Sequence, residues 1–204
     1  MRTEILDRAV SEFLGKHADA VVVNLGGGLC TRFSRLDNGR VRWLEVDLPE
    51  VEPVWLQVFQ TTDRHQFLAY SVLDYAWVEA IKPFKASPIL FIAEGLLMYF
   101  SESEVKQLLK TIQTNFPQSQ MLFEALSPFM IANYKRHPAV SQTNAVFKWG
   151  IKTGKELEAW DSNIQLIEEW YYIDRHPNRW RWMQLFKFIP PLRRSMKIIQ
   201  LRFI

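Results

Sequence analysis

The chain has 204 residues, 48% of them hydrophobic and 23% charged, a balance that indicates one folded domain and argues against disorder. Its single cysteine, Cys30, excludes an internal disulfide and a zinc site built from several cysteines, and its four histidines show no paired ligand spacing. The charged N-terminal stretch is unlike a signal peptide and no apolar run is long enough to cross a bilayer, so we expect a cytoplasmic protein that binds no metal.

The net charge of +3 is unevenly distributed along the chain. Residues 175–204 hold eight Lys and Arg and no acidic residue, whereas the first 174 residues hold seventeen basic and twenty-two acidic residues, a net of −5. A basic, aromatic segment is compatible with binding to nucleic acid or to a membrane surface. We favour a folded segment whose arginines face water or an anionic ligand, because long alternating strands flank it. The expected partner is therefore a small molecule, with no nucleic acid and no membrane.

The spacing of apolar residues predicts helices that alternate with strands. The first element is an amphipathic helix over 3–15, with Ile5, Leu6, Ala9, Val10 and Phe13 on one face. Further helices are expected after Pro49, over 102–114 with Ser101 and Glu104 as a capping box, and from Ser127 and Pro128 onward. The expected strands are 20–25, 41–47, 66–72, the first part of 88–100, 120–126, 164–173 and 196–204.

This alternation predicts an α/β fold with a doubly wound, mostly parallel sheet. We expect one domain over 1–204, because the sequence shows no internal repeat and no low-complexity linker. Residues 136–162 are the one irregular stretch, and we expect them to form an insertion on the substrate side.

Functional residues gather where the strands are expected to end. The stretch VVVNLGGGLCTR, residues 21–32, runs from a strand into three glycines and then into polar residues that can open a helix. Gly26 and Gly28 would let a ligand approach the backbone closely. Asp47, nineteen residues after Gly28, is placed to accept hydrogen bonds from two ribose hydroxyls. Glu94 follows the fourth strand, and the carboxyl ends of parallel strands meet at one edge of the sheet.

The same residues narrow the class of ligand. Glu94 lies within the apolar stretch IAEGLLMY and needs a cationic partner, either a ligand or a Lys or Arg of the protein. Asp47 can serve a ribose, or it can cap the helix after Pro49. A third glycine for a pyrophosphate is absent, since Thr31 stands in its place. A ribose, a positive charge and no pyrophosphate describe S-adenosylmethionine better than a nicotinamide dinucleotide, so an oxidoreductase is the weaker hypothesis.

Four stretches, VVVNLGGGLCTRFSRL, VRWLEVDLPEV, SVLDYAW and ILFIAEGLLMYF, resemble the leucine carboxyl methyltransferase family, and RHPAV and LIEEWYY resemble its bacterial polyketide O-methyltransferase branch. The resemblance implies the Rossmann-like class I methyltransferase fold, with seven strands of which the last is antiparallel. It implies S-adenosyl-L-methionine as cofactor and S-adenosyl-L-homocysteine as product. The implied activity is methylation of a carboxylate or hydroxyl of a small, polyketide-like molecule. Methylation of a protein C-terminal carboxylate is the alternative.

The resemblance also implies which residues bind the cofactor. Two charged residues would serve its amino-acid end, with Arg2 on the carboxylate and Glu94 on the ammonium. The remaining implied contacts are Gly26 and Gly28 beside the methionyl chain, Asp47 on the ribose, and Ser71 and Val72, at the end of the third strand, along the adenine.

This chain departs from the family pattern at two places. Cys30 stands where the family usually has Asp, so a carboxylate at the start of a helix is lost. Family members usually carry some tens of residues before the helix of Arg2, and these help to cover the cofactor and substrate. The sequence therefore predicts a site without that N-terminal lid, which would be more open to water. A cofactor-binding remnant without catalysis is a further alternative.

The acceptor decides whether a catalytic base is needed. A carboxylate, with a pKa near ~4, is already ionised at neutral pH, whereas a phenol, with a pKa near ~10, would be helped by a base. Tyr99 and His137 are candidate bases, although core packing and simple solvation are the better explanations of them. Trp180, Arg181 and Trp182 could form an aromatic, basic wall for an anionic aromatic substrate, although packing is the better explanation of them.

Overall fold

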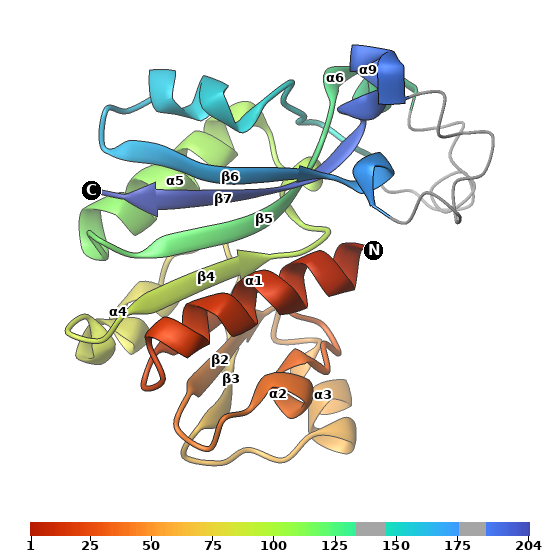
Figure 1. Cartoon of the computed structure of the whole chain (residues 1–204). Helices are drawn as coiled ribbons and strands as arrows, with labels where there is room; N and C mark the ends of the chain where they lie inside the picture. The colour runs from red at the N-terminus through yellow and green to blue at the C-terminus, as the bar shows by residue number, and fades with distance from the viewer. Residues whose placement is uncertain (134–145, 176–186) are drawn as a thin grey trace.

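The computed structural model describes residues 1–133, 146–175 and 187–204. A single seven-stranded sheet with the order β3-β2-β1-β4-β5-β7-β6 runs through this part of the chain (Figure 1). In chain order the strands are β1 Val21–Leu25, β2 Arg42–Asp47, β3 His65–Ala69, β4 Ile89–Ala93, β5 Gln120–Leu126, β6 Ile164–Tyr171 and β7 Met196–Phe203.

The strand order explains where a ligand can bind. β1 pairs in parallel with both β2 and β4, and the chain reaches β4 only after β2 and β3 have been laid down on the other side of β1. The carboxyl ends of β1 and β4 are therefore the topological switch point, where open α/β sheets bind their ligands. β7 is antiparallel to both β5 and β6. The predicted doubly wound sheet with an antiparallel last strand is confirmed.

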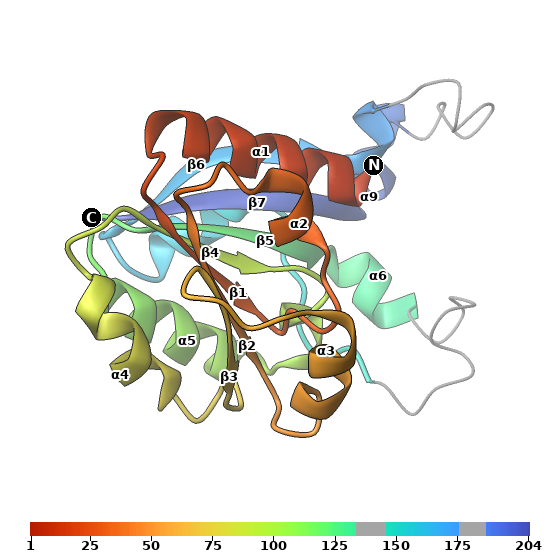
Figure 2. The same ribbon diagram turned by 90° about the horizontal axis from the view of Figure 1, so that it is seen from below.

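Helices cover both faces of the sheet. Figure 2 shows α1 on one face and α4 and α5 on the opposite face. The helices are α1 Arg2–Lys16, α2 Arg32–Leu36, α3 Glu52–Val58, α4 Trp77–Ile81, α5 Glu102–Asn115, α6 Pro128–Asn133 and α9 Pro190–Arg193. Short 3-10 turns at Lys82–Phe84, Leu97–Tyr99, Gly154–Ala159 and Tyr172–Asp174 complete the connections.

The core forms two layers because strand residues alternate between the two faces. One layer packs α1 against Trp43, Ile92, Leu122 and Ile198. The other packs α4 and α5 against the opposite face of the same strands. All five residues of β1 and all five of β4 are buried, as expected for central parallel strands covered on both sides. The carboxyl end of β1, which carries the glycine loop, is thereby packed between two helical layers.

Helices α1 and α5 follow the predicted patterns closely. All five apolar residues predicted for one face of α1 are buried, and Leu14 extends that face. At the start of α5, the Ser101 hydroxyl accepts a hydrogen bond from the Glu104 backbone N–H at 3.3 Å, and the Glu104 carboxylate accepts one from the Ser101 N–H at 2.6 Å. The predicted capping box is confirmed.

The third strand is shorter than predicted. It ends at Ala69, so Ser71 and Val72 lie in the turn that follows and do not form its end. The Asp74 N–H donates to the Ser71 carbonyl at 3.1 Å, which turns the chain, and the Trp77 indole N–H donates to the Val72 carbonyl at 2.9 Å. The apolar residues after Ala69 are used to pack this turn on the core, which the sequence pattern alone does not distinguish from strand pairing.

Several predicted features lie outside the described residues. These are the whole RHPAV stretch, which contains His137, and the Trp180, Arg181 and Trp182 group. Within the described C-terminal part, the Arg193 guanidinium pairs with the Asp174 carboxylate at 2.6 Å. No helix among the described residues is long and apolar enough to cross a membrane.

Candidate functional site

The glycine loop directly follows β1. Gly26 and Gly28 both have positive φ angles, 65° and 53°, which a side chain would strain. The third glycine, Gly27, is constrained by its neighbours, because a Cβ there would lie 2.1 Å from the Glu45 carboxylate. Space beside Gly28 is open, with no atom within 4 Å of a Cβ placed there. A side chain at Gly27 would therefore clash with the protein, whereas the space beside Gly28 is free.

Glu45 and Asn24 form a buried polar pair beside Gly27 of this loop. Glu45 of β2 has no exposed surface and accepts a hydrogen bond from the Asn24 side-chain amide at 2.7 Å. The His65 ring nitrogen lies 3.5 Å from its other oxygen. Burial raises the pKa of the Glu45 carboxyl, although the hydrogen bonds from His65 and Asn24 act in the opposite direction. This pair was not predicted from the sequence, because a charged residue inside an apolar strand gives no sign of its partners.

Asp47 is hydrogen-bonded to the glycine loop. One of its carboxylate oxygens accepts a hydrogen bond from the Gly28 N–H at 2.7 Å, and the other accepts one from the Leu48 N–H at 2.7 Å. The next helix, α3, begins at Glu52 and has no side-chain cap, so the alternative that Asp47 caps it is wrong. A carboxylate has about four lone-pair sites, so Asp47 keeps acceptor capacity for two hydroxyls.

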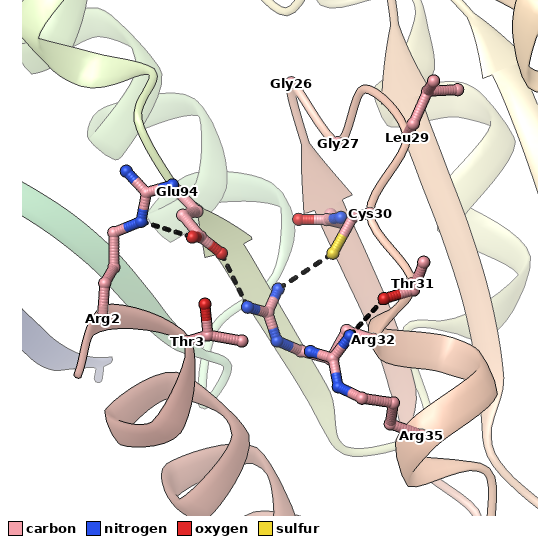
Figure 3. Close-up of a pocket in the computed structure, with 11 residues that line it drawn as sticks. Arg2, Thr3, Gly26, Gly27, Leu29, Cys30, Thr31, Arg32, Arg35 and Glu94 are labelled. Carbon is pink, nitrogen blue, oxygen red and sulfur yellow. Dashed lines mark hydrogen bonds and ion pairs between the residues drawn. The ribbon is translucent and has the colours of Figure 1, made fainter. Parts of the chain in front are cut away.

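A cavity of about 350 Å³ lies between the start of α1 and the glycine loop (Figure 3). It brings together three of the predicted cofactor residues, Arg2, Gly26 and Glu94. Gly28, Asp47, Ser71 and Val72 do not line this cavity. The residues that line it beyond those predicted are Thr3, Asn24, Gly27, Leu29, Cys30, Thr31, Arg32 and Arg35.

Glu94 lies between two guanidinium groups, as Figure 3 shows. One carboxylate oxygen is 2.5 Å from Arg2 Nε, and the other accepts a hydrogen bond from Arg32 Nη2 at 2.6 Å. Of the two partners considered for Glu94, protein arginines are the ones present in this structure. Arg2 and Glu94 were each predicted to face the ligand, whereas their contact with one another was not predicted.

Arg32 is the main residue of the cavity that the sequence analysis missed. Its side chain is only 1% exposed, and it bonds Asp7 of α1 at 2.8 Å and the Cys30 sulfur at 3.2 Å. Burial acts to lower the pKa of Arg32, but Cys30, Glu94 and Asp7 outweigh it and the pKa is raised. The Cys30 sulfur thus accepts a hydrogen bond inside the cavity. Burial raises the pKa of the Cys30 thiol.

The residues present fit S-adenosylmethionine at its two charged ends and its ribose. The Arg2 side chain is 48% exposed and uses Nε on Glu94 and Nη1 on Glu124, which leaves further N–H donors for a carboxylate. Arg32 and Arg35 are both paired with Asp7, so Arg2 is the lining arginine best placed to meet an anionic group. The free acceptor capacity of Asp47 suits a ribose. An ammonium at Glu94 would share that carboxylate with two arginines.

The candidate catalytic residues receive little support from the geometry. Tyr99 is 38% exposed, and its ring packs edge-on against Phe147 at 5.2 Å between ring centres, outside the cavity. His137 is outside the described residues. Among the residues that the structure describes, no group of three or more His, Cys, Asp or Glu side chains is arranged to hold a metal ion.

Comparison with known proteins connects this geometry with a family. The sequence profile of the leucine carboxyl methyltransferases matches residues 1–113. The chain is 29% identical over 174 residues to the tetracenomycin polyketide synthesis O-methyltransferase TcmP of Streptomyces glaucescens, a match that covers 85% of this chain. The chain spans only 64% and 62% of the lengths of the two curated relatives that it matches.

Solved structures share the fold at low sequence identity. A DUF574 family protein from Streptomyces avermitilis superposes with a TM-score of 0.68 at 15% identity, covering 100% of this chain and 82% of the other. The N-methyltransferase NodS from Bradyrhizobium japonicum, in complex with S-adenosyl-L-homocysteine, superposes with a TM-score of 0.58 at 10% identity, covering 96% of this chain and 86% of the other. These likenesses confirm the fold.

Proposed function

The chain belongs to the leucine carboxyl methyltransferase family, which depends on S-adenosylmethionine, and from this premise we propose that it is an O-methyltransferase acting on a carboxylate or hydroxyl of a small, polyketide-like molecule. The observation that carries the proposal is the cluster at the carboxyl ends of β1, β2 and β4. There the glycine loop, the Asp47 carboxylate bonded to it, and the Arg2–Glu94 ion pair occupy one edge of the sheet.

We propose that Arg2 and Glu94 bind the amino-acid end of the cofactor. Arg2 stands at the first turn of α1, half-exposed at the cavity, and its guanidinium can donate to a carboxylate in a forked geometry. Glu94 would accept from the ammonium while it keeps its bonds to the arginines. Gly26 and Gly28 allow the intervening chain to lie against the backbone.

We propose that Asp47, Ser71 and Val72 serve the nucleoside. Two backbone N–H groups already orient the Asp47 carboxylate. It can therefore accept hydrogen bonds from two ribose hydroxyls without changing its rotamer. Ser71 is partly exposed in the turn after β3. Val72 is only 6% exposed and its carbonyl already accepts a hydrogen bond from the Trp77 indole, so it would offer the adenine a small apolar contact.

The bound cofactor supplies a methyl group that is already activated on a sulfonium. The protein then has to place the acceptor oxygen in line with that methyl group and to exclude water. For a carboxylate acceptor, ionised at neutral pH, no residue needs to remove a proton. For a phenol acceptor a base would help, and Tyr99 and His137 remain the candidates from the sequence.

A second cavity supports a small aromatic acceptor. It has a volume of about 200 Å³ and is lined by Pro128 and Phe129 of α6, Pro190 and Pro191 of α9, and Ser127, Lys152 and Arg194. α6 follows the carboxyl end of β5 and α9 precedes the antiparallel β7, so both lie at the same edge of the sheet as the glycine loop. Apolar walls with Lys152 and Arg194 beside them suit an anionic aromatic molecule.

The proposal is tested by assaying methyl transfer from methyl-labelled S-adenosylmethionine to a panel of aromatic carboxylic acids and phenols. Each labelled product is then treated with mild base, which releases methanol from a methyl ester but leaves a methyl ether intact. Labelled small-molecule product of either kind supports the proposal, and its base lability identifies the acceptor group. Labelling of a peptide with a C-terminal leucine, and of no small molecule, would contradict it.

A further inference from the structure

A second carboxylate contacts Arg2, at a different guanidinium nitrogen from Glu94. Glu124 of β5 is only 4% exposed. One of its oxygens accepts a hydrogen bond from Arg2 Nη1 at 3.1 Å, and the other accepts one from the Tyr172 hydroxyl at 2.7 Å. Gly95 lies beside this pair, since a Cβ there would be 3.8 Å from both Arg2 Nη1 and the Glu124 carboxylate. The arginine is thus held between the ends of two neighbouring strands.

These contacts extend into a continuous chain of opposite charges. From Tyr172 it passes through Glu124, Arg2, Glu94 and Arg32 to Asp7, which also pairs with Arg35. It joins α1, α2, β5, the loop after β4 and the 3-10 turn after β6. Every link is 3.1 Å or shorter. A displacement of any one member therefore changes the partners available to the next.

The charges in this chain compensate one another under burial. Burial raises the pKa of the Glu124 carboxyl, while Arg2 and the Tyr172 hydroxyl act to lower it. Burial acts to lower the pKa of Arg2, but Glu124 and Glu94 outweigh it and the pKa is raised. A buried carboxylate that loses its cation is costly, so Glu124 favours the conformers of Arg2 that keep the guanidinium beside it.

Arg2 needs such a restraint because it lies at a helix end. It is the first residue of α1, which has no side-chain cap, and its own side chain is 48% exposed. An arginine side chain loses rotamer freedom when it is fixed, a cost that a ligand must otherwise cover. Contacts that fix the side chain beforehand therefore increase affinity for whatever group the guanidinium binds.

We propose that Glu124 and Tyr172 are positioning residues that hold the Arg2 guanidinium ready for the carboxylate of the cofactor. The inference rests on the proposed function, in which Arg2 binds that carboxylate. It adds that the turn after β6, in the C-terminal part of the chain, contributes to cofactor affinity without contacting the cofactor.

The test compares two ligands that differ in the amino-acid end. S-adenosylhomocysteine carries the carboxylate and ammonium, whereas 5′-methylthioadenosine has neither. Calorimetric titrations are made with the wild type, Tyr172→Phe and Glu124→Gln. Tyr172→Phe removes only the hydroxyl, and Glu124→Gln removes the charge but keeps the shape. Each variant should bind S-adenosylhomocysteine about 5- to 30-fold more weakly, less than for a lost direct hydrogen bond to a charged group because the effect acts through Arg2, and bind 5′-methylthioadenosine as the wild type does.

Other outcomes are equally informative. Unchanged binding of both ligands by the variants, or an equal loss for both ligands, would overturn the inference, the latter indicating a purely structural role. If Glu124→Gln does not fold, Tyr172→Phe decides alone. The control Glu12→Gln removes an exposed carboxylate of α1 that pairs only with Arg8 in the structure, and it should change neither affinity. A folded wild type that binds neither ligand would contradict the proposed function itself, and the inference falls with it.

Discussion

Arg32 illustrates how single residues determine the character of this site. Its guanidinium is almost fully buried, yet it stays charged because Asp7 and Glu94 each accept a hydrogen bond from it. Removal of one partner of a buried ion pair leaves an uncompensated charge and costs on the order of 3–5 kcal/mol. Glu94 is therefore both a candidate ligand residue and the carboxylate that keeps two arginines in place.

Asp47→Ala should weaken the binding of S-adenosylhomocysteine with little change in the fold. The substitution removes the proposed acceptor for the ribose and also the bond to the Gly28 N–H at 2.7 Å. A loss of about 1.5–3 kcal/mol, or roughly 10- to 150-fold in affinity, is expected for a hydrogen-bonded charged group. Calorimetric titration measures it, with Asp63→Ala, an exposed aspartate before β3, as the control. Wild-type affinity in Asp47→Ala would remove Asp47 from the ribose role.

Gly27→Ala should destabilise the protein, because the new methyl group would lie 2.1 Å from the Glu45 carboxylate and 2.8 Å from the Asn24 amide. Overpacking of this kind costs about 1–3 kcal/mol. The matched control is Gly15→Ala in α1, where a Cβ meets nothing within 4 Å and no positive φ is required. That change should stabilise the protein by about 0.5–1 kcal/mol. Urea unfolding measures both, and equal effects would contradict the packing seen at Gly27.

Glu45 gives a prediction for pH. Burial raises the pKa of this carboxyl above 4.5, its ordinary value, so the folded protein holds a proton that the unfolded chain releases. That contribution to stability is present at low pH and is lost as the pH rises from about 4.5 through the folded pKa. Glu45→Gln cannot titrate, so its stability relative to the wild type should increase between pH 4.5 and pH 8. Urea unfolding at the two pH values measures this, and a constant difference would contradict it.

At the scale of elements, sequence signals with a local mechanism predicted the structure best. α5 begins at Ser101 because the capping box satisfies backbone N–H groups locally, and α1 follows its apolar period. α2 and α4 have five residues each, too few for a helical period to be visible; a helix opening after the glycine loop was expected, whereas α4 was not predicted. β3 ends earlier than predicted because the residues after Ala69 pack as a turn on the core.

Ser101→Ala should destabilise the protein by about 1 kcal/mol through loss of the helix cap. The hydroxyl accepts from the Glu104 N–H at 3.3 Å, and an alanine would leave that donor without this partner. Thr114→Ala, near the exposed C-terminal end of the same helix, is the control and should change stability by less than about 0.5 kcal/mol. Both are measured by urea unfolding. Equal losses would mean that the cap does not contribute.

At the scale of the whole molecule, the strand order determines which predicted residues meet. Alternating helices and strands predicted the parallel sheet, and parallel strands place the glycine loop, Asp47 and Glu94 at one edge, as the structure shows. Their partners could not be predicted in the same way. Glu124 and Tyr172 are 48 residues apart in sequence, and nothing in the apolar pattern pairs them. Long-range contacts between charged side chains depend on the final packing, which sequence periodicity does not encode.

The central claim is that this chain binds S-adenosylmethionine at the edge formed by the glycine loop, Asp47 and Arg2. The most direct measurement is calorimetric titration of the purified 204-residue chain with S-adenosylmethionine and, separately, with S-adenosylhomocysteine. The account predicts one saturable site with a dissociation constant in the micromolar range for both. A chain that is folded by circular dichroism yet binds neither compound would contradict the account.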